Sequence, residues 1–326
     1  MPGSEFIDKK ELNSIKKVFD SGGVLFRYGQ ANQRNGKFFA QSFEDKFANF
    51  LNVKYSLAVS SGTAALRVAL ASLNIGKGDE VITQSFTFVA TVEAIIESGA
   101  KPICLNIDNT LNLDPKELKK KITKKTKAII LVHMLGSPGE VKEILNICKS
   151  FKIKLIEDTA WGLGAKYQNK YLGTLGDIGT FSFDYAKTIT TGEGGMVIFK
   201  NKKTFDKAKA WHDHGHENNP KLPRWRDTRK SEGFNFRISE ITAAIGIAQI
   251  EKLKMILEYQ RVNANYLINK LKKLNMKCFN FRLIPANTIA NYDAVILIFK
   301  DKKQSVFLKK KNWNKIIYLQ KSYLRL

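Results

Sequence analysis

Short apolar segments alternate with helical segments from Tyr55 to Asp158, and this alternation constrains the fold more than any other feature of the chain. The expected strands are residues 55–60, 80–83, 101–107, 127–133 and 154–158, separated by expected helices at residues 63–73, 90–98, 115–122 and 141–151. Two more strand-like segments follow at residues 179–183 and 195–200. Strands separated by helices in this way form a mostly parallel sheet covered by helices on both faces.

Helical patterns also flank this alternation. They cover residues 9–19 and 42–50 before it and residues 239–271 after it, the last either as one long amphipathic helix or as a broken pair. A further strand is expected at residues 294–299. We therefore expect N-terminal helices and a large domain in residues 1–250, and a connecting helix with a partial small domain in residues 251–326.

The length of 326 residues and the hydrophobic content of 44% fit a packed protein with one large and one smaller domain. The formal net charge is +24. The lysines are spread along the chain without the interleaved aromatic residues of a base-stacking surface, so we do not expect a nucleic-acid partner. The positive potential would instead help to attract a phosphorylated or acidic ligand.

Three cysteines, Cys104, Cys148 and Cys278, occur in no metal-binding spacing and indicate a reducing compartment. The N-terminal residues lack the apolar segment of a signal peptide, and no apolar run is long enough to cross a bilayer. The expected location is cytoplasmic, with no membrane partner.

Polar and aromatic residues follow several of the expected strands. Ser60 to Thr63 lie where the first strand passes into a helix, where amides and hydroxyls bind phosphate; an ordinary helix N-cap is the alternative. Phe88 and Asp158 fall at the carboxyl edge of the sheet, where ligands bind in open α/β proteins. Phe88 would stack on a ring or belong to the core, and Asp158 would pair with a protonated ring nitrogen or cap a turn.

Lys187 lies in the run from Phe181 to Gly195, between a strand end and a turn rich in threonine and glycine. In a lysine-rich chain, a surface lysine is the simple alternative. A lysine about thirty residues after a strand that ends in Asp158 nevertheless suits pyridoxal phosphate, which needs a lysine for a Schiff base and an acid for its pyridine nitrogen.

Phosphate cradle, aromatic ring, acid, serine and lysine occur in an order typical of the fold-type-I pyridoxal phosphate enzymes. Within them the chain resembles the DegT/DnrJ/EryC1/StrS sugar aminotransferase family. The matching stretches, in about residues 55–252, are SSGTAALRVAL, GDEVITQSFTFVATVEAI, IEDTAWGLGA, GDIGTFSF, KTITTGEGGMV and GFNFRISEITAAIGIAQI. The resemblance implies an aspartate-aminotransferase-like α/β large domain with a mostly parallel central sheet, and a shortened C-terminal α+β small domain.

The resemblance also implies roles for individual residues. Lys187 would bind the cofactor and move a proton between substrate and cofactor, and Asp158 would pair with the pyridine nitrogen. Asn235 would reach the phosphate of a neighbouring subunit, which implies a homodimer with shared active sites. The expected cofactor contacts are Ser61, Gly62, Thr63, Phe88, Asp158, Trp161, Ser182, Lys187 and Asn235.

Two further stretches resemble one branch of the family, the Kdo8N transaminases, which aminate C8 of 3-deoxy-manno-octulosonate (Kdo). They are the N-terminal MPGSEF with Phe26 to Tyr28, and Trp211 to His216. Other branches aminate nucleotide-linked 4-keto or 3-keto hexoses. Three alternating histidines without an evident fourth ligand do not predict a metal site. The candidate substrate contacts are Arg27, Tyr28, Glu193, His214 and His216.

Two features depart from the family pattern. Trp161 stands where the family commonly has a glutamine that contacts the ring hydroxyl of the cofactor, and tryptophan has one donor and more bulk. The chain also ends earlier than its relatives, in the basic stretch KKKNWNKIIYLQKSYLRL. We therefore expect a reduced small domain or a truncated chain.

These observations predict a transaminase that moves an amino group, with L-glutamate as the expected donor, to a keto or aldehyde sugar for lipopolysaccharide or other cell-surface polysaccharide synthesis. Lys187 argues against the dehydratase branch of the family, in which histidine replaces the lysine. A non-catalytic protein that binds pyridoxal phosphate is the alternative from another class, and DNA binding rests on charge alone.

Overall fold

The computed structural model describes residues 3–219, 221–299 and 318–320. The central strands are β1 (Tyr55–Val59), β2 (Glu80–Gln84), β3 (Lys101–Leu105), β4 (Thr126–Val132), β5 (Lys154–Asp158), β8 (Ile178–Ser182) and β9 (Gly195–Phe199). The helices between them and after them are α3 (Gly62–Ser72), α4 (Val89–Glu97), α5 (Pro115–Lys121), α6 (Val141–Phe151) and α7 (Lys202–Trp211). The flanking helices are α1 (Lys9–Asp20), α2 (Phe39–Leu51) and α8 (Glu240–Lys273).

Shorter elements complete the described chain. The 3-10 helices are η1 (Gly3–Phe6), η2 (Met134–Gly136) and η3 (Arg224–Arg226). The short strands are β6 (Lys166–Tyr167), β7 (Lys170–Tyr171), β10 (Phe279–Phe281), β11 (Thr288–Ile289), β12 (Leu297–Phe299) and β13 (Tyr318–Gln320).

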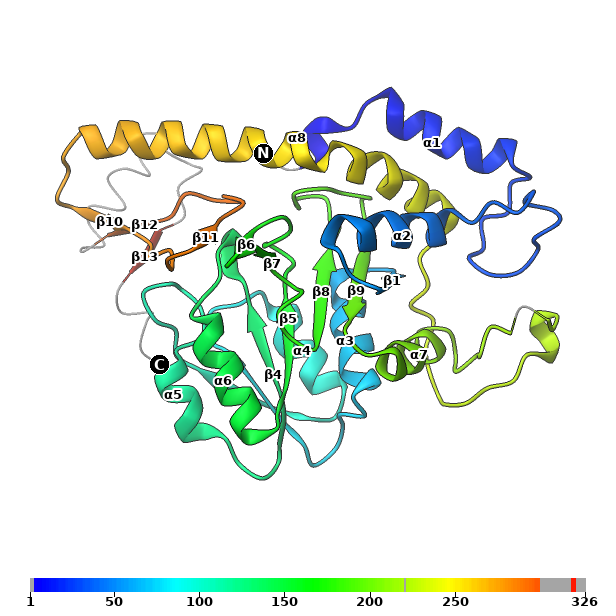
Figure 1. Ribbon diagram of the computed structural model, residues 1–326, viewed down its shortest axis with the longest axis horizontal. Helices are drawn as coiled ribbons and strands as arrows, with labels where there is room; N and C mark the ends of the chain where they lie inside the picture. Colours follow the sequence, from blue (N-terminus) through cyan, green and yellow to red (C-terminus); the bar gives the residue numbers. More distant parts are fainter. Residues whose placement is uncertain (1–2, 220, 300–317, 321–326) are drawn as a thin grey trace.

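The seven central strands form one sheet in the order β1-β9-β8-β5-β4-β2-β3 (Figure 1). Strand β9 is antiparallel to both of its neighbours, and the pairs from β8 to β3 are parallel. The α/β class and the mostly parallel sheet expected from the sequence are confirmed. Helix α7 was not expected, and α2 begins three residues before its predicted start at residue 42.

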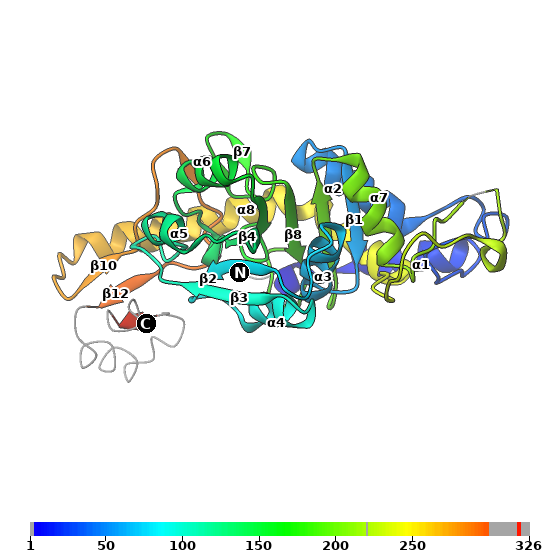
Figure 2. The same cartoon turned by 90° about the horizontal axis from the view of Figure 1, so that it is seen from below.

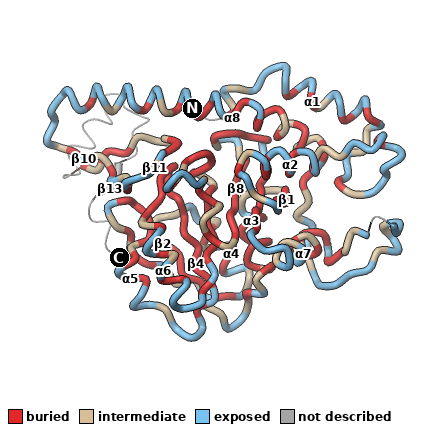
Figure 3. Tube along the Cα trace, viewed as in Figure 1, coloured by how far each residue is buried: buried red, intermediate tan, exposed pale blue. Residues whose placement is uncertain are grey.

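Successive residues of a central strand face opposite sides of the sheet, and helices cover both sides. In β4, Ile130 and Val132 belong to an apolar cluster with α3 and α4, whereas Ile129 and Leu131 belong to a cluster with α5 and α6. Figure 2 shows α5 and α6 on one side of the sheet and α4 on the other. The central strands are drawn mostly as buried in Figure 3, as strands covered on both faces should be.

Helix α8 is continuous over 34 residues and runs along the upper edge of the molecule in Figure 1. The broken pair considered from the sequence is therefore wrong. Gly246 allows α2 to pack closely on α8, because a Cβ atom there would lie 2.6 Å from the ring of Phe43. The buried Lys252 of α8 donates to Glu11 of α1 at 2.8 Å, which fixes the N-terminal helix to the same support. The domain boundary predicted between residues 250 and 251 falls inside α8 and remains a prediction.

The end of α8 and the strands after it build a separate, smaller apolar cluster from Leu271, Phe279, Leu297 and Phe299. Strands β10 and β12, which carry the three phenylalanine and leucine side chains that follow α8, form a three-stranded sheet with β13. The strand expected at residues 294–299 is confirmed as β12, and most of the basic C-terminal stretch lies outside the described residues. Across the part of the chain that the structure describes, no helix is long and apolar enough to span a membrane.

Candidate active site

A pocket of about 280 Å³ opens at the carboxyl edge of the sheet, where β4, β5 and β8 end. Segments distant in the sequence meet there because parallel strands end at the same edge. Glu193, one of the candidate substrate contacts, lines this pocket, whereas Asn235 does not. The expected cofactor contacts that line the pocket are Ser61, Gly62, Thr63, Phe88, Asp158, Trp161, Ser182 and Lys187.

The start of α3 forms one wall of the pocket. Ser61 is the N-cap of α3, and its hydroxyl accepts a hydrogen bond from the amide of Ala64 at 3.0 Å. The N-cap is therefore present, and it does not exclude phosphate binding by the other first amides of the helix. Gly62 lies against the end of β8, because a Cβ atom on Gly62 would be 2.7 Å from Cβ of Ser182. The first amides of a helix have no partner within it, and the close approach at Gly62 places these donors beside the Ser182 hydroxyl.

Asp158 ends β5 and is buried. Its Oδ2 accepts a hydrogen bond from the hydroxyl of Thr91 at 2.9 Å, and its Oδ1 accepts one from the amide of Ala160 at 3.2 Å. Burial raises the pKa of Asp158, although these hydrogen bonds and the charge of Lys187 oppose the rise. Asp158 forms no salt bridge within the described residues, so its carboxylate remains able to pair with a cationic donor in the pocket.

Lys187 follows β8 in a turn closed by a hydrogen bond from its amide to the carbonyl of Asp184 at 3.0 Å. Its side chain is partly buried, and its Nζ lies 3.4 Å from the ring centroid of Trp161. Burial lowers the pKa of Lys187, whereas the charges of Asp293, Asp158 and Asp184, in that order, oppose the decrease. An amine with a lowered pKa is neutral more often near pH 7, and it is then able to accept a proton.

Two more predicted residues line the pocket at its exposed side. Phe88 is the N-cap residue of α4 and is 63% exposed, so the alternative of a core phenylalanine is wrong. Glu193 follows Gly192, whose φ of +80° places the turn in the left-handed region that glycine favours. Trp161, which departs from the family pattern, also lines the pocket, with its ring in contact with the Lys187 amine.

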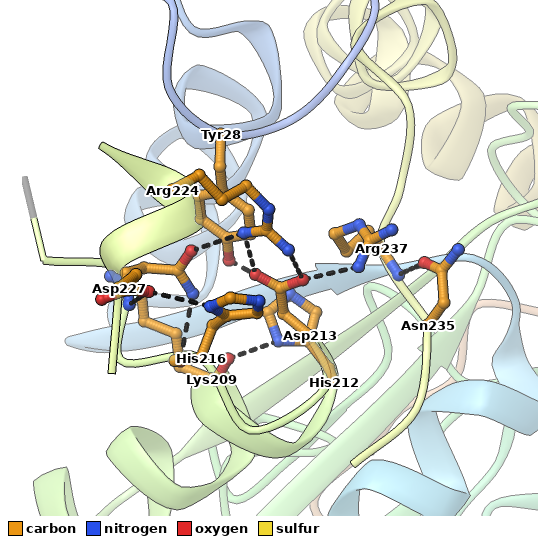
Figure 4. A network of polar contacts seen from close by, with 10 residues as sticks. Tyr28, Lys209, His212, Asp213, His216, Arg224, Asp227, Asn235 and Arg237 are labelled. Carbon is orange, nitrogen blue, oxygen red and sulfur yellow. Dashed lines mark hydrogen bonds and ion pairs between the residues drawn. The ribbon is translucent and has the colours of Figure 1, made fainter. Parts of the chain in front are cut away.

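The other candidate substrate contacts do not line this pocket, and two of them, Tyr28 and His216, belong to a polar cluster around Asp213 (Figure 4). Arg27 is buried and forms a salt bridge with Glu44. The Tyr28 hydroxyl contacts Nε2 of His212 at 3.1 Å. His216 is buried, and its Nδ1 contacts a carboxylate oxygen of Asp227 at 3.1 Å. Arg27 and His216 thus each already contact a carboxylate, whereas His214 is exposed in a left-handed conformation with φ of +53°.

Asp213 is the centre of this polar cluster and was not predicted from the sequence. It is fully buried and accepts hydrogen bonds from Nη1 and Nη2 of Arg224 at 2.8 and 2.5 Å, and from Nη1 of Arg237 at 2.5 Å (Figure 4). Burial alone would raise the pKa of Asp213, but the two arginines outweigh it and lower the pKa. Asn235, beside Arg237, is exposed. Among the described residues no group of three or more His, Cys, Asp or Glu side chains is placed to bind a metal ion.

A second buried pair, His133 and Glu157, lies at the ends of β4 and β5 and was also not predicted from the sequence. Nε2 of His133 lies 2.7 Å from Oε2 of Glu157, and the same carboxylate accepts hydrogen bonds from the amides of Gly173, Leu175 and Gly176. The amide of His133 donates to the carbonyl of Asp158, which joins β4 to β5 at the pocket edge. Both residues are polar positions at the ends of otherwise apolar strands, and that pattern could have identified them.

Comparison with known sequences gives a single consistent result. The DegT/DnrJ/EryC1/StrS aminotransferase family matches residues 7–318. GDP-perosamine synthase of Escherichia coli O157:H7 is 43% identical over 224 residues, which cover 68% of this chain and 60% of that protein. GDP-perosamine synthase of Vibrio cholerae is 36% identical over 272 residues, which cover 83% of this chain and 70% of that protein. The chain thus spans less than two thirds of the Escherichia coli relative.

Solved structures with the same fold include two that bear on ligands. NtdA of Bacillus subtilis, solved with bound cofactor PMP, has a TM-score of 0.81 and 26% identity, covering 94% of this chain and 67% of that one. A mutant of GDP-4-keto-6-deoxymannose-3-dehydratase (ColD), solved with GDP-perosamine, has a TM-score of 0.80 and 28% identity, covering 98% and 91%. Pyridoxal phosphate, the cofactor expected from the sequence, is the cofactor of the aminotransferases of this family.

Proposed function

Because the chain belongs to the DegT/DnrJ/EryC1/StrS aminotransferase family, we propose that it is a pyridoxal phosphate-dependent transaminase that aminates the keto group of a nucleotide-linked hexose. One observation carries the proposal. The amine of Lys187 and the carboxylate of Asp158 line the same pocket, and within the described residues neither forms a salt bridge. Charged groups without an ionic partner at the ligand-binding edge of a sheet are available for chemistry.

The residues of the pocket fit the cofactor. The close approach of Gly62 to Ser182 leaves amide and hydroxyl donors for a phosphate, with Ser61 and Thr63 beside them. Asp158 would pair with the protonated pyridine nitrogen, and the exposed ring of Phe88 would lie against the cofactor ring. Bound pyridoxal phosphate supplies an electron sink for the carbon that loses its proton.

Lys187 would provide the base and the acid of the reaction. Its amine accepts the proton from the α-carbon of the amino donor, expected to be L-glutamate, which leaves as 2-oxoglutarate. It returns a proton to the sugar carbon when the amino group is delivered to the former keto position. The ring of Trp161 at 3.4 Å covers one side of the amine, restricts its motion and keeps water from that side.

The acceptor is inferred from the relatives. Two of them are named GDP-perosamine synthases, and the ColD structure contains GDP-perosamine. These relatives favour a nucleotide-linked 4-keto hexose over the Kdo acceptor suggested by the N-terminal and histidine segments. The net charge of +24 supports an anionic acceptor such as a sugar nucleotide. Glu193 and the exposed His214 remain candidate sugar contacts, whereas the pairing of Arg27 and His216 supports a structural role for both.

The active unit would be a homodimer. Asn235 is exposed and lies outside the pocket of its own chain, next to Phe234, which is 54% exposed. These observations support the placement of Asn235 at the phosphate of a second subunit, as the family resemblance implies. Equilibrium ultracentrifugation would test this arrangement, with a dimer expected and a monomer at all concentrations against it.

The test of the proposed reaction mixes the protein with pyridoxal phosphate, L-glutamate and GDP-4-keto-6-deoxymannose, and follows 2-oxoglutarate and the amino sugar by mass spectrometry. Equal amounts of the two products are expected. A parallel reaction contains the C8-oxidised octulosonate, and amination of that sugar alone would overturn the proposed acceptor. If the protein binds the cofactor but forms no keto acid from any of several amino donors, it would instead be a non-catalytic cofactor-binding protein.

A further inference from the structure

We propose that Asp293, from the segment that follows α8, is the carboxylate that sets the protonation of the Lys187 amine. Asp293 would thus be a positioning residue that acts on the reaction through Lys187. The proposal rests on the proposed function in that Lys187 is taken as the reacting amine. The proposal gives a role in the chemistry to a segment that lies outside the strands of the central sheet.

The segment that carries Asp293 is fixed to the large domain by its neighbour Asn291, which is fully buried. Nδ2 of Asn291 donates to the carbonyls of Trp161 and Leu163 at 2.8 and 3.0 Å, and its amide donates to the carbonyl of Gly136 at 3.2 Å. Its Oδ1 accepts a hydrogen bond from the amide of Asp293 at 3.0 Å. The buried side chain of Asn291 therefore ties the backbone of Asp293 to the large domain.

Gly136 makes this approach possible. Its φ is +81°, and a Cβ atom there would lie 1.8 Å from Oδ1 of Asn291 and 3.0 Å from the amide nitrogen of Asp293. Any larger residue would displace both. From the other side, Arg261 of α8 donates to the carbonyl of Ala290 at 3.1 Å and to that of Gly164 at 2.9 Å. The segment from Ala290 to Asp293 is thus held by hydrogen bonds both from α8 and to the large domain.

Trp161 joins the fixed segment to Lys187. Its carbonyl accepts the hydrogen bond from Asn291, and its ring lies under Nζ of Lys187. Of the acidic groups that act on Lys187, Asp293 has the largest influence, ahead of Asp158 and Asp184. Asp158 is already hydrogen-bonded to Thr91, whereas the carboxylate of Asp293 has no hydrogen bond or salt bridge within the described residues.

The charges around Asp293 explain how the pair would respond to pH. Burial raises the pKa of Asp293 to about 6, opposed by the charge of Lys187. Above that pH the carboxylate is charged and favours the ammonium form of Lys187. Below it the carboxyl group is neutral, and the favourable interaction with Lys187 is lost.

The test measures the protonation of Lys187 in the cofactor-free protein, by competitive labelling with acetic anhydride as a function of pH and mass spectrometry of the Lys187 peptide. We expect Asp293→Asn to lower the apparent pKa of Lys187 by about one unit, since a neighbouring carboxylate is removed. Asp293→Glu, which keeps the charge, should restore most of the wild-type titration. Asp206→Asn, which removes an exposed carboxylate of α7, is the matched control and should leave the titration unchanged.

A Lys187 titration that is identical in wild type and Asp293→Asn would overturn the proposal. Thermal melts of each variant identify any protein that fails to fold, and Asp293→Glu then provides the comparison. The labelling needs neither cofactor nor substrate, so its outcome is independent of the proposed transaminase activity. A protein without transaminase activity could still show the shift, and an active transaminase could lack it.

Discussion

The pocket at the sheet edge and the polar cluster around Asp213 both contain buried or partly buried charged side chains, but among the described residues only those of the cluster are paired with opposite charges. In the cluster, Asp213 is paired with Arg224 and Arg237, and His216 with Asp227. In the pocket, Lys187 rests on an aromatic ring, and burial shifts its pKa downward. Buried charges that satisfy one another stabilise a fold, whereas buried charges without such partners reduce stability and remain available for ligands.

The largest expected effect is a loss of reaction rate when the lysine of the pocket is removed. Lys187→Ala should slow the formation of 2-oxoglutarate from L-glutamate by about a thousandfold or more, because the base is lost. The free energy of unfolding should not fall, since the lysine has no salt bridge to lose within the described residues. Single-turnover kinetics and thermal melts measure the two quantities, with Lys202→Ala on the surface of α7 as the control. A rate within tenfold of wild type would show that Lys187 is not the reacting amine.

The next largest effect is a loss of stability when the polar cluster around Asp213 is disrupted. Asp213→Ala should lower the free energy of unfolding by about 3 kcal/mol, because two arginines lose their buried partner. Asp206→Ala, which removes an exposed partner of Lys202, should change it by less than about 1 kcal/mol. Urea denaturation of both variants measures the difference. Equal losses would mean that the buried cluster contributes no more than a surface ion pair.

The pH dependence of stability should have opposite signs in the two regions. The pKa of Asp213 is lowered in the folded protein, so its contribution to stability is present above its unfolded value of 3.8 and is lost as the pH falls through the folded pKa. The pKa of Asp293 is raised to about 6, so its ionisation reduces stability as the pH rises from about 4 to 6.

Asp293→Asn should therefore gain stability relative to wild type over that range of pH, by about 3 kcal/mol at most. Urea denaturation at pH 4.5 and pH 7.5 measures the change. A difference between the two proteins that is constant with pH would contradict the assignment of a raised pKa to Asp293.

The smallest expected effect concerns the shape of the pocket. Gly62→Ala should weaken the binding of pyridoxal phosphate by about tenfold, or about 1.4 kcal/mol, because its Cβ would lie 2.7 Å from Cβ of Ser182 and would push α3 away from β8. Gly76→Ala is the matched control, since its Cβ would meet only the carbonyl of Ser98 at 3.5 Å. Fluorescence titration with the cofactor compares the two. Equal affinities would show that the cradle does not bind the phosphate.

Features that depend on local pattern could be predicted from the sequence. The central strands and the positions of Asp158 and Lys187 at the sheet edge follow from apolar segments that alternate with helices. Phe88 was ambiguous, because its sequence neighbours do not show whether the start of α4 is covered, and the structure leaves it 63% exposed.

The remaining features depend on contacts between distant segments. Asp213 lies between two histidines in the sequence, and its arginine partners are Arg224 in η3, 11 residues later, and Arg237, 24 residues later. Asp293 gains its position from Asn291, whose partner carbonyl lies 130 residues earlier, in Trp161. Helical and strand periodicity carries no information on such pairings, so the cluster and the contribution of the C-terminal segment needed the structure.

The most direct test of the central claim is to find which lysine binds the cofactor. The protein is incubated with pyridoxal phosphate, reduced with borohydride, digested and analysed by mass spectrometry. Because the chain has 54 lysines and arginines in total, non-specific attachment would appear at many surface lysines. We predict that one equivalent of the reduced cofactor is attached at Lys187 and that Lys187→Ala loses it. A label spread over surface lysines, with Lys187 unmodified, would contradict the assignment of the pocket.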